Sequence, residues 1–142
     1  MKKTRLKIDY DYDFFLLGIV SAAKEYKLAW KLNNALNIKL VKQEDIVIPQ
    51  MGGRDLYISN LLYETENSRI RLISNRSMAD DSEEKSNLLP ELQNFTHFFV
   101  LQDESESFDQ TEIVDIIKKL DATDYVVSIA PEKLKNKDNL IF

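Results

Sequence analysis

The sequence predicts an α+β fold: a mainly antiparallel sheet of about five to six strands with two helices packed on one face. Three observations favour it. Strand-like apolar segments outnumber helical ones, only two segments show helical spacing of their apolar residues, and the strand-like segments follow one another along the chain. A run of strands accompanied by few helices is typical of this class, in which the helices cover an antiparallel sheet.

The composition fits one globular domain spanning residues 1–142. Hydrophobic residues make up 44% and charged residues 30%, and three Gly and three Pro leave little material for a linker. A net charge of −5 argues against bulk nucleic-acid binding, which needs Lys and Arg to neutralise phosphates. Without cysteine the chain has no disulfide, thiolate nucleophile or Cys-ligated zinc, and we expect a cytoplasmic protein.

The first predicted strand alternates strictly over residues 5–14, with one apolar and one charged side. Such alternation indicates a strand with one wet face. The apolar run 15–20 that follows predicts burial on both faces, and Gly18 within it indicates a bulge or bend. This run is too short for a membrane span, which needs about 20 residues.

Residues 24–37 predict the first helix, because their leucines and alanines recur at helical spacing along one arc. Ser21 is a candidate for the N-cap, and Asn37 is suited to the C-terminus.

Several short strands are expected in the middle of the chain. Residues 56–63 and 69–74 predict a hairpin joined by the polar loop 64–68. The remaining segments are strands at 38–41, 45–48 and 95–101, a turn at 49–53 containing Gly52 and Gly53, and a mobile acidic loop near 76–88.

The second helix has the clearest start. Asp109 and Glu112 form a pair typical of a capping box, and Phe108 and Ile113 occupy the positions of a hydrophobic staple. A last strand at 125–129 and a C-terminal tail at 131–142 complete the prediction.

One segment resembles a known family. Leu89-Pro90-Glu91 and Phe95 follow the pattern of the IPExxxVDY family of uncharacterised bacterial proteins, although Thr96 and His97 stand where that pattern has Asp and Tyr. The segments 9–14, 26–33 and 131–142 also look like the opening strand, first helix and closing tail of that family. The resemblance implies no activity, because the family has none assigned.

Two aromatic residues on the first helix are candidates for partner binding. Tyr26 and Trp30 lie outside the leucine arc and share their side with Asn33 and Asn37. Tyr and Trp are enriched in binding hot spots, which favours a partner surface. The alternative, which the sequence favours, is that both rings pack beneath a loop.

The tail ends in three apolar residues, Leu140, Ile141 and Phe142, after the lysines 133, 135 and 137. A free apolar end usually docks. We expect docking on its own domain, and the functional alternative is docking on another protein.

Other constellations have structural interpretations. Asp9, Asp11 and Asp13 fit a solvated strand face better than a metal site, since carboxylates strung along one strand cannot surround an ion unaided. His97, the single histidine, fits a structural strand position, and Gly52-Gly53 lacks the residues of a phosphate-binding loop.

The leading functional hypothesis is therefore a small non-catalytic cytoplasmic module that binds a protein or self-associates, with no cofactor, metal or membrane contact. The alternative is an RNA-associated regulatory protein that uses a basic patch from Lys2, Lys3, Arg5 and the tail lysines. A third hypothesis, a metal-dependent enzyme, would depend on the Asp9–Asp13 strand.

Overall fold

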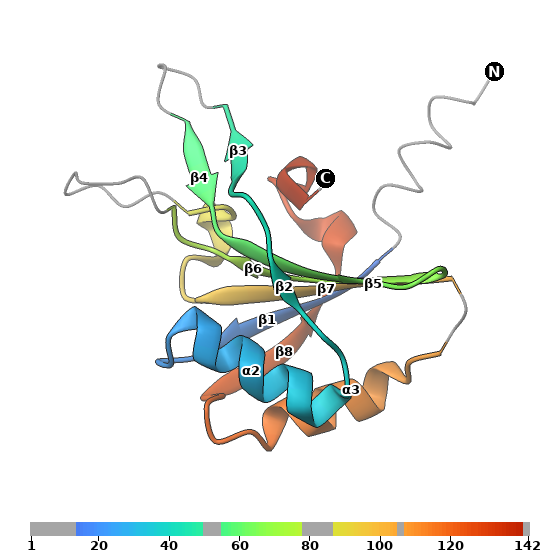
Figure 1. Ribbon diagram of the computed structural model, residues 1–142. Helices are drawn as coiled ribbons and strands as arrows, with labels where there is room; N and C mark the ends of the chain where they lie inside the picture. Colours follow the sequence, from blue (N-terminus) through green and yellow to red (C-terminus); the bar gives the residue numbers. More distant parts are fainter. Residues whose placement is uncertain (1–13, 50–54, 78–86, 105–106, 141–142) are drawn as a thin grey trace.

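The α+β fold is confirmed by the computed structural model, which describes residues 14–49, 55–77, 87–104 and 107–140. Helices α2 and α3 cover one face of a six-stranded antiparallel sheet, and a small two-stranded sheet and the C-terminal segment lie on the other (Figure 1). The strands are β1 (Phe15–Val20), β2 (Val41–Lys42), β3 (Ile46–Ile48), β4 (Leu56–Ile58), β5 (Asn60–Glu64), β6 (Ser68–Ser74), β7 (His97–Asp103) and β8 (Tyr125–Ile129). The helices are α2 (Glu25–Leu36) and α3 (Gln110–Lys118), with short 3₁₀ turns at Pro90–Leu92, Pro131–Lys133 and Lys137–Leu140.

Strand β1 lies inside the sheet, whose order is β2-β5-β6-β7-β1-β8. It pairs with β7 on one side and β8 on the other, and its four central residues are buried, as the apolar run predicted. The bulge or bend expected at Gly18 is wrong, because Gly18 pairs regularly with Phe98 and Val127. A Cβ there would lie 2.7 Å from ring carbons of Phe95, so glycine is required by close packing instead.

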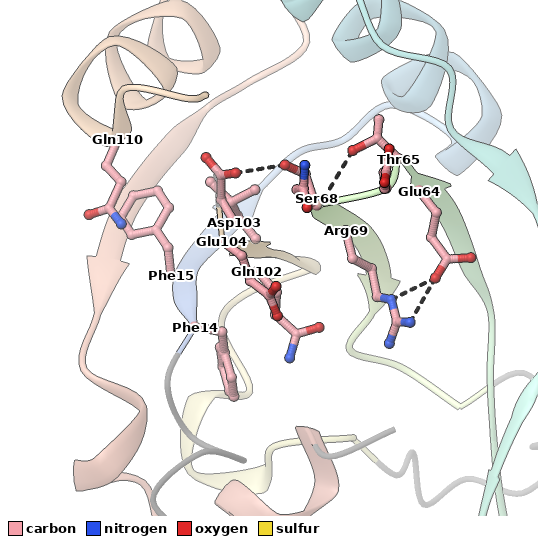
Figure 2. A pocket seen from close by; sticks show the side chains of 13 residues that line it. Phe14, Phe15, Glu64, Thr65, Ser68, Arg69, Gln102, Asp103, Glu104 and Gln110 are labelled. Atoms are coloured by element: carbon pink, nitrogen blue, oxygen red, sulfur yellow. Dashed lines mark hydrogen bonds and ion pairs between the residues drawn. The ribbon is translucent and has the colours of Figure 1, made fainter. Parts of the chain in front are cut away.

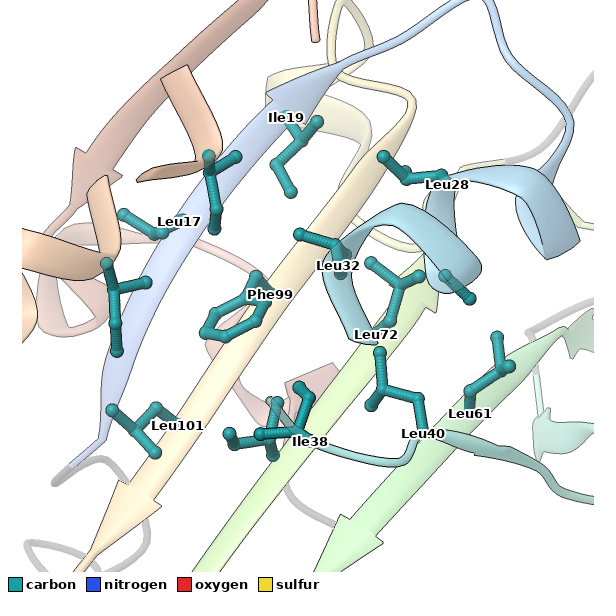
Figure 3. Packing of buried hydrophobic residues seen from close by; sticks show 14 of the residues in the cluster. Leu17, Ile19, Leu28, Leu32, Ile38, Leu40, Leu61, Leu72, Phe99 and Leu101 are labelled. Carbon is teal, nitrogen blue, oxygen red and sulfur yellow. The ribbon is translucent and has the colours of Figure 1, made fainter. Parts of the chain in front are cut away.

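The main core lies between the sheet and the two helices (Figure 3). Leu28 and Leu32 of α2 meet Phe99 and Leu72 of the sheet, and all four side chains are fully buried. The leucine arc of the sequence is therefore the buried side of α2, and the opposite side faces outward.

A second core covers the other face of the sheet, where β3, β4 and the C-terminal segment pack. The single strand expected at 56–63 is two strands that belong to different sheets, β4 pairing with β3 and β5 with β2 and β6. The break falls at Ser59. The hairpin of β5 and β6, joined by residues 65–67, agrees with the sequence prediction. Strand β7 begins and ends two residues later than expected, at 97–103 instead of 95–101.

The helix ends agree only in part with expectation. Ser21 does not cap α2: its hydroxyl donates to the carbonyl of Ala122, and Lys24 is the N-cap without a side-chain hydrogen bond. Asn37 ends α2 in the left-handed conformation, at φ 56°, as its position suggested. Asp109 caps α3 by accepting a bond of 3.2 Å from the Glu112 N–H, which confirms the predicted start.

Four sequence expectations lie outside the described residues. They are the strand at 5–13 with its three aspartates, most of the turn at 49–53, the acidic stretch 78–86 and the last two residues, Ile141 and Phe142.

Candidate functional site

The outward side of α2, here called the α2 outer face, carries the two aromatic residues chosen from the sequence. Tyr26 is 71% exposed and Trp30 64% exposed, one helical turn apart. The expectation that both rings pack beneath a loop is wrong. The apolar arc of α2 is occupied by the core, and the described parts of the chain leave both rings largely uncovered, so they form an apolar patch on the helix.

Asn33 and Asn37 share this side, but they shape the end of the helix. Asn33 Oδ1 accepts a bond of 2.8 Å from the N–H of Leu40, and its backbone carbonyl accepts one of 3.1 Å from Ile38. Asn37 supplies the left-handed residue that ends α2. Asn33 therefore fixes the turn that leads toward β2, and its amide oxygen is already engaged.

A shallow hollow of about 450 Å³ borders Tyr26 at the start of α2. Three lysines line it, Lys24, Lys27 and Lys31, together with small alanines and Asp121. Lys31 Nζ lies 2.8 Å from Asp121 Oδ1, and this bond lowers the pKa of the Asp121 carboxyl. The hollow thus joins the aromatic patch to a group of positive charges.

A polar network that was not predicted from the sequence lies under the first turn of α2. Lys42 Nζ donates to Ser59 Oγ at 2.6 Å, and Ser59 Oγ in turn donates to Glu25 Oε2. The other oxygen of Glu25 is 3.7 Å from Nε2 of His97. Ser59 is buried and both of its hydrogen-bonding roles are used, so the serine ties α2 to the sheet.

His97 is buried on β7 and belongs to this network. Burial lowers its pKa to about 4, so the ring is neutral at neutral pH and its approach to Glu25 is not an ion pair there. Nδ1 lies 3.0 Å from Thr96 Oγ1. The four network residues come from separate segments, and no spacing in the sequence would reveal that they meet.

A larger hollow, of about 720 Å³, lies at the other end of the sheet, beside the β5–β6 turn (Figure 2). Four of its polar side chains form two pairs with one another. Arg69 binds Glu64 at 2.7–2.8 Å, and Ser68 Oγ donates to Asp103 Oδ1 at 2.6 Å. Phe14, the first residue of the described chain, forms part of the wall. Arg69, Glu64, Ser68 and Asp103 are therefore already engaged in contacts within the chain.

The C-terminal segment docks on its own domain as far as it is described. Leu140 is buried with Leu134 in the second core, as expected, whereas Ile141 and Phe142 lie outside the described residues. Within the described parts of the chain, no group of three or more His, Asp or Glu side chains is arranged to hold a metal ion.

The segment that carries the family resemblance also has a structural role. Leu89 is fully buried, and Pro90 begins a 3₁₀ turn. Glu91 Oε2 accepts a bond of 2.9 Å from the backbone N–H of Asn136, and Phe95 packs against Gly18. The segment therefore links the sheet to the C-terminal region.

No family model, curated protein or solved structure matches this chain. Neither described helix has the length and apolar character needed to cross a membrane.

Proposed function

We propose that this protein is a small non-catalytic interaction module of the cytoplasm, and that it binds another protein through the α2 outer face. The observation that carries the proposal is the exposure of Tyr26 and Trp30, 71% and 64%, on a helix whose other side is fixed in the core. Trp and Tyr combine a large apolar surface with a polar tip. In many interfaces, their substitution by alanine causes the largest losses of binding free energy.

The rigidity of the helix supports this proposal. Leu28 and Leu32 anchor α2 in the core, and Glu25 ties its first turn to Ser59. The backbone that carries Tyr26 and Trp30 is already ordered, so binding does not have to pay for ordering it and more of the contact energy appears as affinity.

The test is co-purification of the tagged protein from its native cells, with Trp30→Ala and Tyr57→Ala compared in parallel. Tyr57 is the matched control, because it is an exposed aromatic residue on β4, away from α2. We expect a specific partner to be lost with Trp30→Ala, at a cost of about 2 kcal/mol or more, and kept with Tyr57→Ala. Circular dichroism checks that both variants fold.

A partner that survives Trp30→Ala would contradict the proposal. RNA recovered without a protein partner would favour the alternative of an RNA-associated regulatory protein. The exposed tail lysines, Lys133 and Lys135, are the described residues on which that alternative depends.

A further inference from the structure

The α2 outer face is positively charged although the chain as a whole carries −5. Glu25 is the single acidic residue of α2, and its carboxylate is turned toward the sheet, where it binds Ser59 and faces His97. Among the described residues, Lys24 and Lys27 have no ion-pair partner, while Lys31 is shared with Asp121. The network beneath the helix thus removes the carboxylate that would otherwise offset these lysines.

The charges and the aromatic rings lie on one continuous surface. Lys24 and Lys27 line the hollow that Tyr26 borders, and Trp30 follows one helical turn later. The small side chains of Ala22, Ala23 and Ala122 also line the hollow, which has a volume of about 450 Å³. Carboxylate side chains placed there can approach Lys24 and Lys27, while neighbouring apolar atoms contact Tyr26.

We infer that the α2 outer face binds an acidic peptide segment of a partner protein. Two Asp or Glu side chains of that segment pair with Lys24 and Lys27, and an apolar side chain packs on Tyr26 and Trp30. This inference rests on the proposed function and names the chemistry of its partner.

The number of free charges favours an acidic peptide over RNA. RNA carries a phosphate at every nucleotide, and its binding gains from neutralising several of them. Two free lysines match two carboxylates, whereas a longer polyanion would meet the excess negative charge of the rest of the chain.

The experiment is selection of a random peptide display library on the immobilised full chain. Selections on wild type, Trp30→Ala and the double variant Lys24→Glu/Lys27→Glu are sequenced and compared. The matched control is Lys133→Glu/Lys135→Glu, which makes the same charge change on two exposed lysines of the C-terminal segment. The most enriched wild-type peptide is then synthesised, and its affinity is measured by fluorescence anisotropy at low and high salt, with oligouridine as the RNA probe.

We expect wild type and the control to enrich peptides rich in Asp and Glu with an apolar residue. The enriched peptide should bind roughly tenfold more weakly to Lys24→Glu/Lys27→Glu, and high salt should weaken its binding to wild type. Peptides that need Trp30 but show no acidic enrichment would overturn the inference and leave the proposed function standing. A failure to recover any Trp30-dependent peptide would remove both, and oligouridine binding more tightly than the peptide would replace the acidic peptide with RNA.

Discussion

The imidazole of His97 lies between the sheet and the first turn of α2, with Glu25 and Thr96 as its polar neighbours. Burial holds its pKa near 4, well below the value of about 6.5 that it has in an unfolded chain. Between these two pH values the unfolded chain binds a proton that the folded chain does not. The contribution of His97 to stability is therefore fully present above about pH 6.5 and decreases as the pH falls toward 4.

We expect the free energy of unfolding to fall by up to about 3 kcal/mol from this residue alone as the pH decreases from about 6.5 to 4. Urea denaturation at several pH values measures the total. Since carboxylates also titrate in the acidic range, the contribution of His97 is the difference in slope between wild type and His97→Gln. Equal slopes for the two proteins would contradict a depressed pKa.

At the scale of elements, the two helices begin differently. Asp109 caps α3 through the N–H of Glu112, whereas Lys24 stands at the N-cap of α2 without a side-chain bond. Lysine is a poor N-cap, because it has no acceptor for the free N–H groups of the first turn and adds positive charge at the positive end of the helix dipole.

Lys24→Asn should therefore stabilise the protein by about 0.5–1 kcal/mol, measured by urea denaturation, because Asn supplies the missing acceptor. The same change should weaken binding of the acidic peptide several-fold, since it removes one of the two free lysines. Asp109→Asn is the matched control: it exchanges one good cap for another and should alter stability by only a few tenths of a kcal/mol. A Lys24→Asn variant less stable than wild type would disprove the account of this helix start.

The elements were predictable where local patterns decide them. The spacing of the leucines predicted α2, and the pair Asp109 and Glu112 predicted the start of α3. Local patterns did not separate β4 from β5, because the apolar residues on both sides of Ser59 suit a strand equally well and only long-range pairing assigns them to different sheets.

The candidate site was predictable in the same partial sense. A helical wheel placed Tyr26 and Trp30 away from the core arc, but it contains no information on what covers them. The inward turn of Glu25 depends on Ser59 and His97, which meet it only after the sheet has formed. The electrostatic character of the surface is therefore a property of the tertiary structure.

At the scale of the whole molecule, the C-terminal segment covers the second core. Leu140 is 3% exposed and packs with residues of β3, β4 and the segment 88–92. Leu140→Ala should cost about 2–4 kcal/mol, because it leaves a cavity in a packed core, whereas Lys135→Ala at an exposed position should stay within about 0.5 kcal/mol. Urea denaturation of the isolated protein compares them. A neutral Leu140→Ala would contradict this account of the second core.

The position of β1 between β7 and β8 has a consequence for how the chain reaches its native state. Strand β1 can pair with β7 and β8 only after residues 97–103 and 125–129 have left the ribosome. Until then, Phe15–Val20 is an unpaired apolar segment. Such non-local pairing slows folding, to milliseconds or seconds in comparable topologies, and exposes a segment that chaperones recognise and that can aggregate. Strand β1, which has a neighbour on each side in the finished sheet, is therefore prone to aggregate before folding is complete.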